Sequence, residues 1–394
     1  MPSAAKQAGC RNLPASFFVT VRRSFAFKCT LLVLGWVLVA IAALQVPAHQ
    51  FWPAAFLGLS LPVALLLTGV LAVYWLLRNW RVALLPILLL VLMWPHVQRG
   101  FALHPLYLVP TGEKAAGQQV QLLSANVRIF NVYAQLRDKN FSSSRHLIKW
   151  LAEQPADVIC LQEFYNEPHT TRANKDVFQS VQRIGPDAHR TPFVSVTLRN
   201  AIGAEFGLAI FSRFPIVNRG TINFGKLTQN HAMFADLRLP GGDTIRVYNA
   251  HLQSMSMDER DIVDSYSSKD GLKAKGVGLL RRFKRGLVAR SRQVDELVQH
   301  MAQCRYPILF CADLNDLPYS YTYDQLADHL QNAHATIGNG IGATYNGRLP
   351  FLRIDQQFAG PQWAIDDFGV HYEIPYSDHF PLTGTYRLKT KTKD

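Results

Sequence analysis

Cysteine is scarce in this sequence, and its few copies are not spaced as metal ligands. Cys10 and Cys29 fall near the N-terminus, while Cys160 and Cys311 lie inside apolar runs, where a free cysteine usually acts as a small hydrophobic residue. Cys304 precedes another apolar run, so an odd number follows the N-terminal region. These features argue against both a zinc module and a full disulfide framework.

Acidic residues are nearly absent from the first third of the chain. Residues 1–117 contain nine of the 41 Lys and Arg residues but one of the 28 acidic residues, Glu113. The formal net charge of +13 is therefore concentrated beside long apolar runs. A nucleic-acid-binding domain carries its basic excess as a patch or stripe, so this charge alone does not indicate a nucleic-acid partner.

Three apolar segments occupy most of the chain between residues 25 and 98. Residues 25–46 and 54–77 reach the roughly 20 residues that a bilayer span needs, whereas residues 82–98 are shorter and include Pro86. A cleavable signal peptide would explain one such run, and no small-residue cleavage site follows the first. We predict three transmembrane helices at these positions, within a membrane domain of residues 1–98.

Basic residues predict how these spans are oriented. Arg22, Arg23 and Lys28 precede the first span, and Arg78 and Arg81 separate the second from the third. The connection between the first two spans contains no Lys or Arg. The positive-inside rule then places the N-terminus in the cytoplasm. We therefore expect a multi-pass protein whose remaining chain lies on the periplasmic side of a bacterial inner membrane.

The chain after a Pro- and Gly-containing linker at residues 99–117 has the pattern of an α/β domain, which we expect at residues 118–394. Residues 142–153 can form a helix with Leu147, Ile148 and Leu151 on one face, and Pro155 ends it. Alternating or short apolar runs before and after this helix predict strands. A strand–helix–strand order indicates an α/β architecture.

Polar side chains recur where the predicted strands end. The clearest case is the apolar run 307–312, which breaks into Asp313-Leu314-Asn315-Asp316. The full set is Asn126, Glu163, Glu205, His251, Asp313, Asn315, Asp355, Asp378 and His379. Each alone has an ordinary structural explanation, but gathered carboxylates repel one another unless a cation lies among them. Oxygen ligands favour Mg²⁺ over zinc, and two histidines suit phosphate chemistry near neutral pH.

Five of these segments, in order, resemble the motif set of the endonuclease/exonuclease/phosphatase superfamily, the DNase-I-like metal-dependent phosphodiesterases. They are residues 158–163, 249–252, 312–316, 353–355 and 377–381. The resemblance extends from about residue 119 to 388. It implies a four-layer α/β sandwich of two facing mixed β-sheets flanked by helices, with the site at one edge. Here that fold would follow three transmembrane α-helices.

The resemblance also implies roles for individual residues. Glu163 would be the principal Mg²⁺ ligand, with Asn126 close by and Asp378 contributing, and Mn²⁺ would be an acceptable substitute. Asp313 would orient and activate the attacking water, and Asn315 would hold a phosphate oxygen.

Two histidines, His251 and His379, would flank the scissile phosphate. Glu205 would pair with His251, and Asp355 with His379, each carboxylate fixing a tautomer. The abasic-site nucleases of the family typically have Tyr where this chain has His251. That difference favours a site of the DNase, sphingomyelinase or lipid-phosphatase type and leaves the substrate open.

Two classes of function are consistent with the sequence. The first is a membrane-anchored, Mg²⁺-dependent phosphoesterase that hydrolyses a phosphodiester or phosphomonoester by in-line attack of an activated water. Its partners would be the lipid bilayer and a phosphate ester (nucleic acid, phospholipid head group or small phosphoester), with no obligate protein partner inferred. The second is a catalytically silent, membrane-tethered binding or scaffold protein on the same fold. Chemically competent residues at every matched position favour the enzyme.

A basic helix is predicted before the central strand, from about Gly278 to Met301. Between Asp270 and Asp295 the sequence has eight Lys and Arg residues and no acid. The helix either packs on the sheet with a solvated basic face, or its first half, around 279–285, lies on the membrane or receives an anionic substrate.

Overall fold

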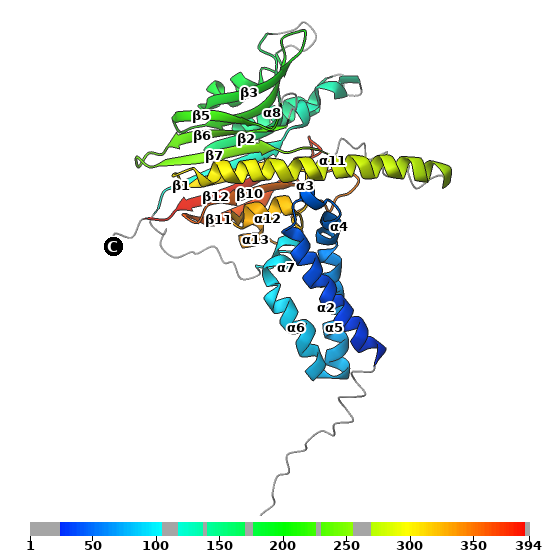
Figure 1. The fold of residues 1–394 in the computed structure, drawn as a ribbon. Coiled ribbons are helices and arrows are strands. Elements are labelled where there is room, and N and C mark those ends of the chain that lie inside the picture. Colours follow the sequence, from blue (N-terminus) through cyan, green and yellow to red (C-terminus); the bar gives the residue numbers. More distant parts are fainter. Residues whose placement is uncertain are drawn as a thin grey trace, which may run out of the picture.

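The computed structural model describes residues 24–104, 117–136, 140–169, 176–225, 230–254 and 269–390. Within these ranges the chain forms a bundle of apolar helices and a domain of two β-sheets flanked by helices (Figure 1). Arg22, Arg23 and most of the predicted linker, residues 105–116, lie outside the described residues.

The helical bundle contains two helices that are long and apolar enough to cross a membrane. These are α2 (Phe25–Leu44) and the segment Ala54–Arg78, which comprises α4 (Ala54–Leu59) and α5 (Leu61–Arg78). A short helix, α3 (Ala48–Phe51), connects them at the end next to the two-sheet domain (Figure 1). Two of the three predicted spans are therefore present as candidate membrane helices.

The third predicted span differs from expectation, because it is not one continuous helix. It consists of α6 (Trp80–Leu92) and α7 (Trp94–Gly100), which are bent by 65° relative to each other. Pro95 stands in the first turn of α7, where the missing N–H and the proline ring interrupt a continuing helix. The pair has the form of a broken span or a re-entrant loop.

The two-sheet domain is built from two mixed six-stranded sheets. The first has the order β11 (Trp363–Val370), β12 (Leu382–Leu388), β1 (Gln119–Asn126), β2 (Val158–Asn166), β4 (Glu205–Ser212) and β3 (Thr191–Arg199). The second has the order β5 (Ile216–Asn223), β6 (His231–Arg238), β7 (Thr244–His251), β8 (Ile308–Asp313), β10 (Asp355–Ala359) and β9 (Gln331–Asn332). Each sheet has one parallel pair at its centre, β1–β2 in the first and β7–β8 in the second. This arrangement fits the DNase-I-like α/β fold that the sequence predicted.

Three hydrophobic clusters explain why the sheets face each other. One cluster is made of inward-facing residues of both sheets, such as Leu122 and Ile210 from the first and Val247 and Leu309 from the second. The other two clusters cover the outer faces, where helices pack. Because side chains alternate along a strand, strands that are apolar on both faces must be covered on both sides.

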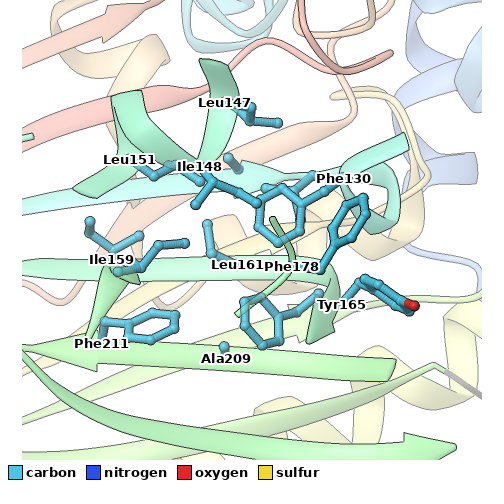
Figure 2. Close-up of a cluster of buried hydrophobic side chains, with 14 of the residues drawn as sticks. Phe130, Leu147, Ile148, Leu151, Ile159, Leu161, Tyr165, Phe178, Ala209 and Phe211 are labelled. Carbon is cyan, nitrogen blue, oxygen red and sulfur yellow. The ribbon is translucent and has the colours of Figure 1, made fainter. Parts of the chain in front are cut away.

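The outer face of the first sheet is covered by α8 (Ser142–Glu153), as Figure 2 shows. Leu147, Ile148 and Leu151 point from α8 toward Ile159 and Leu161 of β2. This is the apolar face that the sequence predicted for the helix. Burial of this apolar face stabilises the packing of α8 on β2.

The outer face of the second sheet is covered by α11 (Lys269–Ala302), the predicted basic helix, and by α12 (Tyr321–Ala327). The N-terminal half of α11 also contacts the helical bundle. The ring of Phe283 stacks on Phe56 with 5.2 Å between centroids, and Lys284 Nζ lies 5.3 Å from the ring of Trp52. The basic helix thus lies at the domain-side end of the candidate membrane helices.

Buried polar contacts join the bundle to the two-sheet domain. The Asp324 carboxylate on α12 accepts hydrogen bonds from Arg99 Nη1, at 2.5 Å, and from Gln45 Nε2. Ala102 pairs with Gly340 through both backbone hydrogen bonds. Residues 99–104, the described part of the predicted linker, therefore pack against the two-sheet domain and fix the position of the domain relative to α7.

Replacing Asp324 with Ala should strongly destabilise this junction. The substitution removes the acceptor of Gln45 Nε2 and leaves the largely buried Arg99 guanidinium without its carboxylate. Removing one partner of a buried ion pair costs about 3–5 kcal/mol. Thermal unfolding of the full chain in detergent should show a lower midpoint for Asp324→Ala.

The matched control is Glu153→Ala, which removes an exposed carboxylate 3.7 Å from Lys149. Exposed pairs contribute little to stability. Equal midpoints for the two variants would contradict the role assigned to Asp324.

Candidate active site

The predicted strand-end residues gather at one edge of the two sheets. Parallel pairing brings the ends of β7 and β8 together, with His251 in register with Asp313. Asp355, the first residue of β10, is in register with Asp313 on the other side. The side chains in such a row point the same way. Asp313 therefore lies between His251 and Asp355 within the second sheet.

Asn126, at the end of β1, connects this row to the first sheet. Its Nδ2 donates to Asp313 Oδ2 at 2.9 Å and to Glu163 Oε1 at 3.2 Å. Its Oδ1 accepts from the backbone N–H of Arg128. One amide thus bridges two carboxylates that come from different sheets.

Glu163 reaches the site because β2 has a β-bulge. Residues Gln162 and Glu163 together oppose a single residue of β4, and Glu163 has a φ of +48°. A bulge turns the strand and redirects a side chain. The Glu163 side chain is 36% exposed, whereas the side chain of Asp313 is 1% exposed. Glu163 is therefore the more accessible of the two carboxylates.

Asn249 of β7 holds the bulge from the opposite sheet. Its Nδ2 donates to the carbonyl oxygens of Leu161 at 2.9 Å and Ala209 at 3.0 Å. Its Oδ1 accepts from Gln162 Nε2 at 2.7 Å. These fully buried contacts satisfy backbone groups that the interrupted ladder leaves open.

Two imidazoles flank the Asp313 carboxylate. His251 Nε2 lies 3.6 Å from Asp313 Oδ2 and 3.7 Å from Glu163 Oε1. His379 Nε2 lies 4.0 Å from Asp313 Oδ2 and 4.0 Å from Asp378 Oδ1. Both histidines are almost fully buried. Each presents its Nε2 toward the centre of the site.

The expected contact between Asp355 and His379 is present. His379 Nδ1 lies 2.8 Å from Asp355 Oδ2, which assigns the proton on Nδ1 to that hydrogen bond. Although burial favours the neutral ring, the carboxylates of Asp355, Asp313 and Asp378 raise the pKa of His379 to about 10. Asp355 thus orients the ring and stabilises its cationic form.

Asn315 follows Asp313 in a left-handed conformation, with a φ of +50°. Its backbone N–H donates to Asp313 Oδ1 at 2.9 Å, and its side-chain Nδ2 donates to the carbonyl oxygen of Leu252 at 3.1 Å. The backbone of Asn315 therefore orients the Asp313 carboxylate. Its amide is engaged with the chain rather than turned into the site.

The predicted pairing of Glu205 with His251 is wrong. Glu205 Oε1 accepts from Arg199 Nη2 at 2.8 Å, and Oε2 accepts from Asn166 Nδ2 at 3.1 Å. Antiparallel pairing places Glu205 opposite Asn166, which lies three residues after Glu163 in β2. The carboxylate is therefore satisfied by its cross-strand neighbours.

Three residues at the site carried no predicted role. Arg128 Nε lies 3.3 Å from Asp378 Oδ2, and Ser377 Oγ donates to the carbonyl oxygen of Asn126 at 2.8 Å. The Tyr345 ring meets the edge of His379 with centroids 5.4 Å apart. Ser377 lies inside a segment that the resemblance covers. Arg128 and Tyr345 lie outside all five segments, so no sequence signal identified them.

The donor set at this edge is compatible with a hard divalent cation. Carboxylate oxygens converge from Glu163, Asp313 and Asp378, and the buried Nε2 of His251 has no hydrogen-bond partner among the described residues. Ligand atoms of Asp313, Asp355 and His379 lie within 4.8 Å of one another, although two of these groups already bond each other. Oxygen-rich sites of this kind suit Mg²⁺.

Comparison with known families gives two matches along the chain. Residues 124–379 match the model described as the Endonuclease/Exonuclease/phosphatase family. Residues 22–100, which include the helical bundle, match a domain of unknown function. No curated protein matches the chain.

Several solved structures are similar to this chain. An endonuclease/exonuclease/phosphatase from Beutenbergia cavernae is 18% identical over 69% of this chain and 72% of its own, with a TM-score of 0.46. The human Nocturnin catalytic domain is 17% identical over 69% and 94%, with a TM-score of 0.46. A mannosyl-6-phosphatase from Bacteroides thetaiotaomicron is 13% identical over 68% and 99%, with a TM-score of 0.45. At these TM-scores no activity is carried over from them.

Replacing Asn249 with Ala should destabilise the domain and move Glu163. The substitution leaves two buried backbone carbonyls and Gln162 Nε2 without their partner. A buried polar group left unsatisfied costs about 1–3 kcal/mol. Thermal unfolding should show a clear loss for Asn249→Ala and little change for Gln182→Ala, an exposed amide that contacts Asp187. A neutral Asn249→Ala would contradict this account of the bulge.

Proposed function

Because the chain belongs to the endonuclease/exonuclease/phosphatase family, we propose that it is a membrane-anchored, Mg²⁺-dependent phosphoesterase. Members of this family are typically hydrolases that act on phosphoester bonds. The observation that carries the proposal is the buried Asp313 carboxylate, held by Asn126 and flanked by His251 and His379. A buried carboxylate between two imidazoles is an arrangement suited to proton transfer.

Asp313 orients the attacking water and accepts its proton. Oδ1 is fixed by the backbone N–H of Asn315, and Oδ2 accepts from Asn126 Nδ2 while facing the two imidazoles. With the carboxylate held in this way, the second lone pair of Oδ2 can hold a water in line with the phosphorus atom. Such positioning is a major part of catalysis of phosphoryl transfer.

The two histidines bind the phosphate oxygens. His379 keeps its Nε2–H directed inward because Nδ1 is engaged by Asp355, and its cationic form stabilises developing negative charge. His251 Nε2 has no partner among the described residues, which leaves it available to a phosphate oxygen. Asn315 joins them by exchanging its contact with Leu252 for a phosphate oxygen.

Glu163 and Asp378 would hold Mg²⁺ through carboxylate oxygens, and Asn126 would join them through Oδ1, the atom that accepts from the backbone N–H of Arg128. Mn²⁺ would be an acceptable substitute. When bound, the cation supplies positive charge against the phosphate oxygens. Arg128 contacts Asp378 from an exposed position and adds a second positive group at the rim. Asp378 is then shared between cation binding and orientation of Arg128.

The substrate is a phosphate ester, either a diester or a monoester, from nucleic acid, a phospholipid head group or a small molecule. The alternative function is a silent binding or scaffold protein on the same fold. A panel of these esters, assayed with the full chain in detergent with and without Mg²⁺, separates the two. Hydrolysis of no ester on the panel would favour the silent protein.

Variants at Asp313 and Glu163 should separate proton transfer from cation binding. Asp313→Asn removes the base and should lower turnover by about 10²–10⁴-fold at every Mg²⁺ concentration. Glu163→Ala should instead raise the Mg²⁺ concentration needed for half-maximal rate. Initial rates across a Mg²⁺ titration measure both effects.

The control for this pair is Asp243→Asn, which changes an exposed carboxylate in the β6–β7 hairpin. It should leave both the rate and the Mg²⁺ titration unchanged. Near-normal turnover in Asp313→Asn would remove the proposed base. An enzyme active with Zn²⁺ but not with Mg²⁺ or Mn²⁺ would refute the cation assignment.

We also propose that the helical bundle spans the membrane three times and leaves the catalytic domain outside the cytoplasm. The contact of α3 with α11, in which the backbone N–H of His49 donates to Ser291 Oγ, supports this orientation, because it puts the two-sheet domain beside the connection that has no Lys or Arg. The α5–α6 turn, with Arg78 and Arg81, lies at the opposite end of the bundle (Figure 1). In this arrangement the bent α6–α7 pair is the third crossing.

A reporter fused after residue 117 should test this orientation. A reporter enzyme that folds only outside the cytoplasm is expected to be active there, because three crossings export that position. A reporter that works only in the cytoplasm is expected to be inactive at the same site. The reverse result would mean that the α6–α7 pair re-enters instead of crossing, or that the bundle is inverted.

A further inference from the structure

A large apolar groove lies where the helical bundle meets the two-sheet domain. Its volume is about 1130 Å³, and its walls come from α5, the α6–α7 pair and the loops near 317–319 and 341–353. Ligand pockets for drug-sized molecules usually occupy about 300–1,000 Å³. The groove is therefore large enough for a long-chain ligand.

The length of the groove along α5 is comparable to the thickness of one leaflet of a bilayer. Along α5 its wall extends from Pro62 to Val73, which at 1.5 Å per residue is about 16 Å. That length is close to half of a hydrocarbon core of about 30 Å. Leu66 and Val70, which line the groove, are 70% and 58% exposed, so it opens sideways to the surroundings of the bundle.

A buried positive charge closes the domain-side end of the groove. Arg353 is 3% exposed; its Nη1 donates to the carbonyl oxygen of Ile341 at 3.0 Å and its Nη2 to that of Arg99. Its Nε has no partner, and within the described ranges no carboxylate pairs with it. By contrast, Arg99 is neutralised by Asp324. A buried, unpaired guanidinium is costly unless an anion binds there.

We propose that this groove binds a membrane lipid, with its hydrocarbon chain along α5 and its anionic, phosphate-bearing head group against Arg353. The apolar walls match the chain, and the uncompensated arginine matches the charge. Leu317 lines the groove four residues after Asp313, and Arg353 precedes Asp355 by two. The bound lipid therefore lies against the segments that carry two residues of the candidate active site. Lipid binding in this groove does not depend on the proposed hydrolysis.

Three probes distinguish the sources of this affinity. Dioleoyl phosphatidic acid has hydrocarbon chains and an anionic phosphate head group. Dioleoyl phosphatidylcholine has the same hydrocarbon chains and a head group without net charge. Inorganic phosphate has the anionic charge and no hydrocarbon chain. Binding to the delipidated full chain in detergent is measured by native mass spectrometry. The Asp313→Asn chain is used in parallel, so that binding is read without turnover and a failure of the proposed enzyme leaves this test intact.

Two glycines provide a matched pair of variants. A Cβ added at Gly69, which lines the groove, or at Gly35 of α2, which does not, meets no atom within 4 Å. Gly69→Trp should fill the groove and weaken phosphatidic acid binding by about tenfold or more. Gly35→Trp should leave that binding unchanged. Arg353→Gln should remove the preference for phosphatidic acid over phosphatidylcholine.

Several outcomes would overturn the proposal. Phosphatidylcholine binding as tightly as phosphatidic acid would remove the role of Arg353. Inorganic phosphate binding as tightly as phosphatidic acid would mean an anion site without a lipid. Equal binding by Gly69→Trp and Gly35→Trp would exclude the groove. If Arg353→Gln does not fold, the glycine pair and the three probes still decide the question.

Discussion

The burial of the Asp313 carboxylate is the constraint on which the arrangement of the domain depends. A carboxylate that is 1% exposed must be compensated by neighbours, and here these come from both sheets. His251 flanks it in register within one sheet, the backbone N–H of Asn315 donates to it, and Asn126 reaches it from the other sheet. The distance between the two sheets and their relative register are therefore tightly constrained. The clusters of apolar residues between and outside the sheets provide that rigidity.

Much of the fold could be predicted from the sequence because strands and helices here carry strong local patterns. The apolar run 158–163 and the run before Asp313 form the central strands, and the stripe of Leu147, Ile148 and Leu151 is the buried face of α8. Residues at the ends of these strands meet because parallel pairing brings their C-terminal ends to one edge. The strands, the buried face of α8 and the strand-end residues could thus be predicted from hydrophobic periodicity and from the order of the motifs.

The parts that could not be predicted depend on contacts between distant segments. The resemblance implies that Glu205 pairs with His251, yet cross-strand neighbours on β2 and β3 satisfy its carboxylate. The bulge at Glu163 has no local signature, because it is held by Asn249 from the facing sheet. The bend between α6 and α7 was also missed, although Pro95 stands at the break. Apolar composition alone does not distinguish a straight helix from a broken one.

The helical bundle and the two-sheet domain form one structural unit, because the contacts between them are specific. Asp324 binds groups from two bundle segments, and Arg353, two residues before Asp355, caps the last turn of α7. The basic helix α11 joins the same junction, because Phe283 and Lys284 pack on aromatic residues of the bundle. A flexible tether would need none of these contacts. Their presence means that the bundle fixes the position of the two-sheet domain relative to the candidate membrane helices. In the function proposed above, the bundle would thereby restrict which phosphate esters can reach the candidate active site.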